Sequence, residues 1–141
     1  MSINNVFGIA GSAMNAQMVR MNSSASNMAN ASTTAGTQES AYKAKRPVFQ
    51  AILSEQQTTL GSPTVGGVKI TEITNDLTPN SSIHDPGHPD ADENGMVYLS
   101  NVNEVAEMVD MLAAARSYQN NVEVMNTAKP VSYTHLRAHE T

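Results

Sequence analysis

The sequence predicts an α+β fold that is mainly α-helical, with long N- and C-terminal helices packed as a coiled-coil-like hairpin and a small central region of strands and loops. Three observations support this prediction. Residues 101–129 lie in the longest stretch without Gly or Pro, apolar residues repeat every seven positions near the N-terminus, and turn residues gather between these segments. We therefore divide the chain into residues 1–36, 37–100, 101–129 and 130–141.

The N-terminal segment predicts a helix from Ile3 to about Ala31. One position of a seven-residue repeat is always large and apolar, as in the seam of a coiled coil: Phe7, Met14, Met21 and Met28. Small residues beside this seam allow a second helix to approach closely: Ala10, Gly11, Ser24 and Ala25. Because Asn and Ser fill most other positions, the helix should be marginal alone and should form fully only when packed.

The central region is expected to form an irregular arm with short strands. Three segments have the composition of strands: residues 48–53, 68–76 and 95–99. Residues 77–92 are rich in Pro and are expected to form a loop.

Residues 101–129 predict an amphipathic helix of roughly 43 Å. Its apolar residues recur three and four positions apart: Val102, Val105, Met108, Val109, Leu112, Ala115, Val122 and Met125. Asn101 and Glu104 fit a capping box at its start, and Glu104, Glu107 and Asp110 place negative charge near the positive end of the helix dipole. Such a long apolar stripe needs a second helix, or copies of itself, to cover it.

Residues 130–141 do not continue this pattern. Pro130 is expected to stop the helix, because proline lacks the amide hydrogen that helix continuation requires. We interpret the segment as a foreign tail, from a vector or a sequencing adaptor, and leave it out of the fold prediction.

Charge and cysteine content exclude several classes of protein. A net charge of -5 and a pI near 5.2 disfavour attraction to nucleic acid or anionic lipid. The one basic cluster, Lys43, Lys45 and Arg46, is expected to lie in a solvated loop. The absence of Cys excludes disulfides, thiolate nucleophiles and Cys-based zinc sites. Neither a membrane span of ~18 apolar residues nor a cleavable secretory signal is recognisable.

The sharpest chemical motif is Asp90, Asp92, Asn94 and Gly95, which matches the start of a calcium-binding loop. The twelfth position of that loop, where a bidentate Glu is needed, is Asn101. We therefore favour a turn rich in Asp and Asn, with calcium binding as the alternative.

Other metal and catalytic motifs are weaker. His84 and His88 are four residues apart, but Pro86 and Gly87 between them prevent the helical geometry of a zinc pair. No nucleophile elbow or phosphate-binding loop occurs, and His88 near Asp90 is a common pairing in loops. The sequence therefore predicts neither an enzyme nor a cofactor.

Three segments carry a family pattern. Residues 7–36 contain S-N-[apolar]-A-N-x-x-T, with Asn27, Ala29, Asn30 and Thr33 on the signature. Residues 101–129 contain N-V…E-M…R-x-Y…N-V, at Asn101, Val102, Glu107, Met108, Arg116, Tyr118, Asn121 and Val122. Together with the loop at residues 85–97, these motifs resemble the flagellar basal-body rod proteins, most closely those of the proximal rod.

The resemblance implies a structural subunit of the drive shaft for motility, exported through the flagellar type III apparatus without a cleaved signal. Its terminal helices would pack into a rod that crosses the periplasm, against other rod proteins and copies of itself. Neither nucleic acid nor direct membrane insertion is implied. The predicted subunit interface comprises Phe7, Met14, Met21, Asn27, Met28, Asn30, Val105, Met108, Leu112, Arg116, Tyr118 and Val122. The alternative function is a calcium-binding or other metal-binding regulatory module at Asp90, Asp92 and Asn94.

Overall fold

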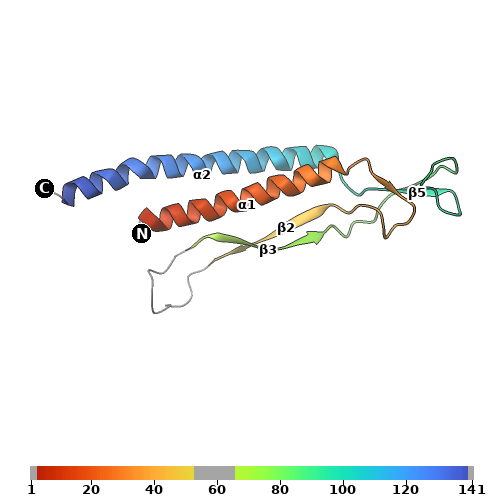
Figure 1. Ribbon diagram of the computed structural model, residues 1–141, viewed down its shortest axis with the longest axis horizontal. Helices are drawn as coiled ribbons and strands as arrows, with labels where there is room; N and C mark the ends of the chain where they lie inside the picture. The colour runs from red at the N-terminus through yellow and green to blue at the C-terminus, as the bar shows by residue number, and fades with distance from the viewer. Residues whose placement is uncertain (1–2, 53–65, 140–141) are drawn as a thin grey trace.

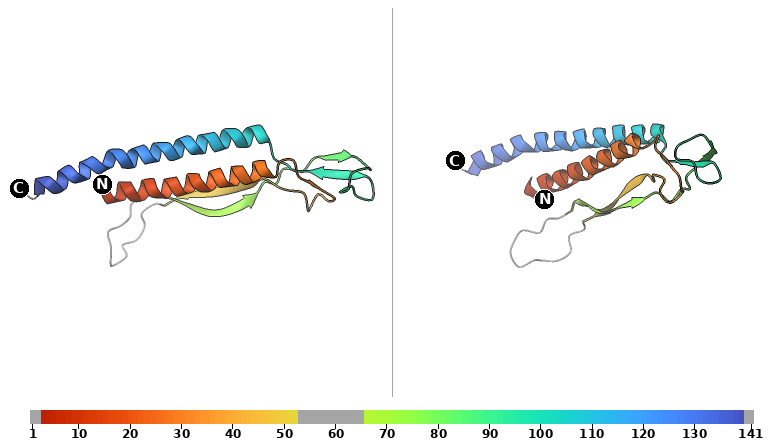
Figure 2. Two further views of the ribbon diagram at one scale, coloured as in Figure 1. Left: turned by 45° about the horizontal axis from the view of Figure 1, so that its top comes forward. Right: turned by 45° about the vertical axis from the view of Figure 1, so that its right-hand side comes forward.

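The computed structural model describes residues 3–52 and 66–139 and is mainly α-helical with two small antiparallel sheets. Helices α1 (Ile3–Ala29) and α2 (Glu104–His139) lie side by side and run in opposite directions (Figures 1 and 2). The N-terminal helix is thus confirmed within two residues at its end. Coiled-coil-like packing between the two helices stays a prediction.

A two-stranded sheet lies along α1, and a three-stranded sheet extends beyond the end of the helix pair (Figure 1). The first consists of β2 (Lys45–Ala51) and β3 (Val68–Asn75). The second has the order β1-β5-β4 and consists of β1 (Thr34–Ala35), β4 (Ser82–His84) and β5 (Met96–Leu99).

The predicted strands at residues 68–76 and 95–99 are confirmed as β3 and β5. The predicted strand at 48–53 begins earlier, at Lys45, and its last residue lies outside the described residues. The loop prediction for 77–92 is wrong at β4, which pairs with β5. Its prolines flank the three paired residues without interrupting them, so the backbone groups remain free to pair.

The core is thin, as the composition predicts. Among the residues whose burial the structure describes (4–52 and 66–130), six apolar residues are buried, and all are small: Ala10, Ala16, Ala41, Ala44, Val97 and Ala114. An equal number of polar residues are buried: Ser23, Ser24, Asn27, Asn80, Ser100 and Glu107. Small side chains let the helices and strands approach closely but contribute little apolar area, so hydrogen bonds between elements determine much of the arrangement.

The start of α2 differs from the predicted capping box. Asn103, not Asn101, caps the helix, because its Oδ1 accepts a hydrogen bond from the amide of Ala106 at 3.0 Å. The side chain of Asn101 is engaged elsewhere, with the backbones of Ala44, Asp76 and Thr78. The capping residue is therefore two positions later than predicted.

The predicted stop at Pro130 is also wrong, because α2 continues through this residue to His139. A proline inside a helix removes one hydrogen bond and crowds the preceding turn, at a cost of about 3 kcal/mol. That cost opposes a helix without forbidding it, and the residues on both sides contain no Gly or second Pro. Whether residues 130–141 are a foreign tail stays a prediction.

Within residues 3–52 and 66–139, no helix combines the length and the apolar content that crossing a bilayer requires.

Candidate subunit-assembly surface

Asn27 joins α1 to the start of β2. Its side chain is completely buried, donates to the carbonyl of Lys45 at 3.0 Å, and accepts from the amide of Lys45 at 2.8 Å. The hydroxyl of Tyr42 also donates to Asn27 Oδ1, at 3.1 Å. The amide side chain thus pairs with both backbone groups of Lys45, as a neighbouring strand would, and connects α1 to the start of β2.

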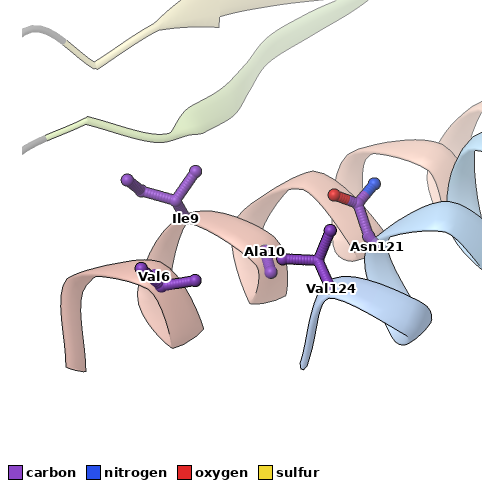
Figure 3. A pocket seen from close by; sticks show the side chains of 5 residues that line it. All are labelled: Val6, Ile9, Ala10, Asn121 and Val124. Atoms are coloured by element: carbon purple, nitrogen blue, oxygen red, sulfur yellow. The ribbon is translucent and has the colours of Figure 1, made fainter. Parts of the chain in front are cut away.

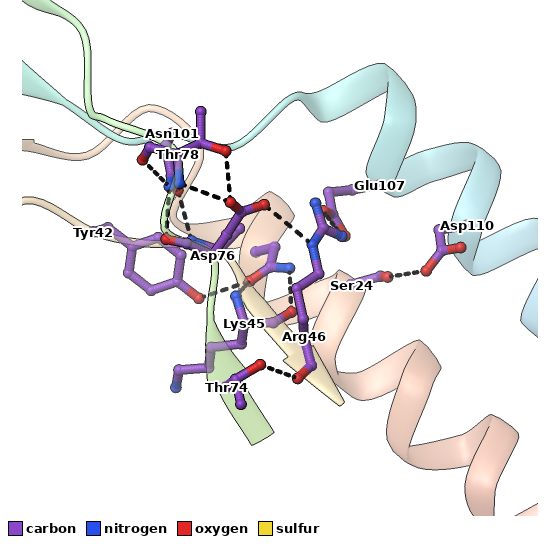
Figure 4. A network of polar contacts seen from close by, with 12 residues as sticks. Ser24, Tyr42, Lys45, Arg46, Thr74, Asp76, Thr78, Asn101, Glu107 and Asp110 are labelled. Atoms are coloured by element: carbon purple, nitrogen blue, oxygen red, sulfur yellow. Dashed lines mark hydrogen bonds and ion pairs between the residues drawn. The ribbon is translucent and has the colours of Figure 1, made fainter. Parts of the chain in front are cut away.

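Two further asparagines connect the loops at the same junction. Asn80 donates to the carbonyls of Tyr42 and Leu99, and Asn101 accepts from the amide of Ala44 at 2.7 Å. Each side chain therefore bridges segments that are distant in the sequence, and Figure 4 shows the contacts of Asn101. Together with Asn27, they hold the segment around Tyr42 between the two helices and both sheets.

Arg46 pairs with a buried carboxylate on α2. Glu107 is completely buried, and Nη1 of Arg46 lies 2.7 Å from its Oε1 (Figure 4). Nε of Arg46 also lies 3.6 Å from Oδ2 of Asp76. The prediction of a loop is therefore wrong for Lys45 and Arg46, which begin β2, whereas the predicted solvation holds, because Lys45 is exposed and the Arg46 side chain is 43% exposed.

A second ion pair, between Arg20 and Asp110, connects α1 directly to α2. Nε of Arg20 donates to Asp110 Oδ2 at 3.1 Å, and Nη2 donates to Oδ1. Two of the three guanidinium nitrogens therefore bind the two carboxylate oxygens. These hydrogen bonds lower the pKa of Asp110 and raise that of Arg20, and burial opposes both shifts. Hydrogen bonds from Thr78 likewise lower the pKa of Asp76.

We expect Asp110→Asn to destabilise the chain at neutral pH and to have little effect in acid. The pKa of Asp110 is lower in the folded chain, so the ionised carboxylate stabilises the fold above its ordinary pKa of 3.8. This contribution is lost as the pH falls through the lower, folded pKa. Urea unfolding followed by circular dichroism, from about pH 7 to about pH 2, measures the difference between parent and variant.

Arg20→Met is the matched variant for this measurement, because it removes the other half of the same ion pair. Its destabilisation should fade over the same acidic range. A difference between parent and Asp110→Asn that stays constant down to about pH 2 would contradict the prediction.

The predicted apolar stripe of α2 is largely uncovered. The side facing α1 carries Glu107, Asp110 and Ala114, whereas four apolar residues on the opposite side are exposed by 52–73%. We call these four the outer ridge: Val105, Met108, Val109 and Leu112. Packing of α1 against α2 therefore leaves the outer ridge exposed, although the sequence predicts that another helix covers this stripe.

The predicted interface residues fall into three groups. Val105, Met108, Leu112 and Arg116 are exposed on α2. The N-terminal seam and the later residues of α2 are half-buried, namely Phe7, Met14, Met21, Met28, Asn30, Tyr118 and Val122. Asn27 alone is completely buried within its own chain.

A shallow apolar groove lies between the N-terminal part of α1 and the middle of α2 (Figure 3). It has a volume of about 210 Å³ and is lined by Val6, Ile9, Ala10, Asn121 and Val124. We call it the helix groove. Its lining contains no ionisable side chain, so it suits an apolar group.

The candidate calcium loop forms the turn that the sequence favours. Oδ1 of Asp92 accepts hydrogen bonds from the amides of Asn94 and Met96, both at 2.8 Å, and Thr34 donates to Asp90. Gly95 has a φ of 73°, which favours Gly at this position. No group of three or more His, Asp or Glu side chains in the described part of the chain is arranged to hold a metal ion.

Comparisons of the sequence with known proteins identify its family. Residues 93–131 match the family model described as the C-terminal region of flagellar basal body rod FlgEFG proteins. The chain is 46% identical over 129 residues to the flagellar basal-body rod protein FlgC of Yersinia enterocolitica, covering 92% of each chain. Identity is 44% to FlgC of Salmonella typhimurium and 43% to FlgC of Escherichia coli O6:H1, again over 92% of each chain. Identity at this level over nearly the whole length shows that the chain belongs to the FlgC family of flagellar basal-body rod proteins.

Proposed function

We propose that the chain is a structural subunit of the flagellar basal-body rod that assembles through its two terminal helices. The observation that carries this proposal is the outer ridge. Exposed apolar residues that are adjacent on one helix face are characteristic of a surface that binds another protein. Because the chain belongs to a family of rod proteins, we infer that its partners are other rod subunits and further copies of the chain.

The interface includes the outer ridge with Arg116 on α2, and the half-buried seam of Phe7, Met14, Met21 and Met28 on α1. In the rod, we infer that α1 and α2 pack as a coiled-coil-like hairpin whose free faces contact neighbouring subunits. Asn27 supports this surface indirectly, by holding β2 against α1.

We also infer that the chain reaches the rod through the flagellar type III export apparatus, without a cleaved signal, and takes its place where the rod crosses the periplasm. The small core supports this inference. Because the buried apolar side chains are Ala and Val, folding removes little apolar area from water, and the chain is easily kept unfolded before assembly.

The test is to express the chain, with an epitope inserted at Gly61, in a bacterium that lacks its own FlgC-family protein. Purified basal bodies are then probed for the epitope, and swimming is scored in soft agar. We expect the epitope in basal bodies and restored motility. The native FlgC-family protein with an epitope at the equivalent position controls for the insertion.

The location of the epitope separates the ways in which this test can fail. An epitope in the medium but absent from basal bodies would contradict assembly while supporting export. An epitope retained in the cytoplasm, with the control chain exported, would contradict the proposed function as a whole.

A further inference from the structure

The outer ridge and the helix groove lie at opposite ends of the helix pair. The ridge occupies the first turns of α2, and the groove is formed by α1 near its N-terminus and by Asn121 and Val124 of α2. At ~1.5 Å per residue, Met108 and Val124 are about 24 Å apart along the helix axis. One chain therefore presents a protruding apolar surface, the outer ridge, and a concave one, the helix groove, at separate positions.

The two surfaces match in character and size. Beyond the ridge, the same exposed side of α2 becomes polar at Gln119, Asn120 and Glu123, so the apolar projection is only about two turns long. At about 210 Å³, the groove is smaller than the roughly 300–1,000 Å³ of typical small-molecule sites. It accommodates one or two aliphatic side chains, and neither surface would bury an unpaired charge against the other.

We propose that the outer ridge of one copy of this chain docks in the helix groove of a second copy. This inference rests on the proposed function and specifies one of its contacts. Contact between two different surfaces of identical subunits does not close on itself, so it can be repeated along an open helical assembly. Pairing of two ridges would instead produce a closed dimer and stop growth, which does not suit a rod.

Engineered cysteines test this contact, because the chain has no Cys of its own. A Met108→Cys chain and a Val124→Cys chain, carrying different epitopes, are co-expressed in the strain that lacks its own FlgC-family protein. Basal bodies are isolated and oxidised. We expect a disulfide-linked dimer that contains both epitopes, and no dimer from either chain alone. A chain carrying both substitutions should form a ladder of linked copies.

The geometry excludes a link within one chain, because a disulfide requires Cα atoms less than about 7 Å apart and these positions are about 24 Å apart on one helix. Gln119→Cys, on the polar part of the same exposed side, is the control in place of Met108→Cys and should give no dimer with Val124→Cys. Leu112→Cys is the second ridge position and should behave like Met108→Cys.

Epitopes in basal bodies without any mixed dimer, from either ridge position, would overturn the inference and leave the proposed function standing. A link from the ridge to a protein of different mass would also overturn it, because the occupant is then another rod subunit. If the cysteine chains fail to enter basal bodies, the purified chains are mixed at high concentration and oxidised. A mixed dimer with the ridge cysteines but not with Gln119→Cys supports the inference, and its absence contradicts it.

Discussion

Replacement of both Met108 and Leu112 by Glu should abolish motility while leaving the fold of the subunit intact. Both side chains are more than half exposed, at 52% and 58%, so the isolated chain should lose less than about 0.5 kcal/mol. In the assembled rod, two carboxylates would be buried in an apolar contact without partners, which costs several kcal/mol. Swimming in soft agar and the amount of subunit in basal bodies measure the effect, and circular dichroism checks the fold.

The matched control is the double variant Gln119→Glu and Asn120→Glu. It adds the same charge on the same helix, at exposed positions beyond the ridge. We expect this variant to enter basal bodies and to support swimming. Normal incorporation of the ridge variant, or equal loss in both variants, would show that the ridge is not an assembly surface.

The sequence predicts the helices well because their signals are local. The seven-residue repeat from Phe7 to Met28 and the apolar spacing from Val105 to Leu112 depend only on neighbouring residues. The same is true of the strand composition of β3 and of the turn at Asp92, where an Asp side chain accepts from amides two and four residues later. These signals can be read from neighbouring residues alone, even where the element, like the N-terminal helix, needs packing to form fully.

The errors occur where distant segments meet. Asn101 fits a capping box by its spacing, but its side chain bonds to the backbones of two distant segments, at Ala44 and at Asp76 and Thr78, and Asn103 is the cap. By sequence, Arg46 belongs to a basic cluster that predicts a loop. In the structure, β2 brings it to Glu107, a contact between residues that no local pattern connects. The error at Pro130 has a different origin. A proline inside a helix has a local and finite energetic cost, so it does not always end the helix.

The candidate surface was also predicted only in part. The spacing of Val105, Met108 and Leu112 shows that they share a face, and the composition shows that this face is apolar. Neither the spacing nor the composition shows whether α1 or a neighbouring subunit covers that face. This depends on which side of α2 meets Arg20, and Asp110 determines that side through the ion pair. The helix groove has no sequence signal, because α1 and α2 both contribute to it.

The buried carboxylate of Glu107 should make the chain strongly dependent on Arg46. Arg46→Met removes the positive charge that lies 2.7 Å from a carboxylate with no exposed surface. Within the described part of the chain, neither oxygen of Glu107 accepts a well-aligned hydrogen bond that would compensate for this loss. We expect a destabilisation of about 3 kcal/mol, measured as a shift of the urea unfolding transition at neutral pH.

The double variant Arg46→Met and Glu107→Leu should recover most of that loss, because it removes the buried charge together with its partner. Lys45→Met provides the control for strand position and side-chain length. Lys45 is exposed, and its contacts with Asn27 involve only its backbone, so this change should stay within about 0.5 kcal/mol. Equal destabilisation by Arg46→Met and Lys45→Met, or no recovery in the double variant, would show that Arg46 does not compensate the charge of Glu107. Recovery would instead show that this ion pair fixes where β2 meets α2 more than it adds stability.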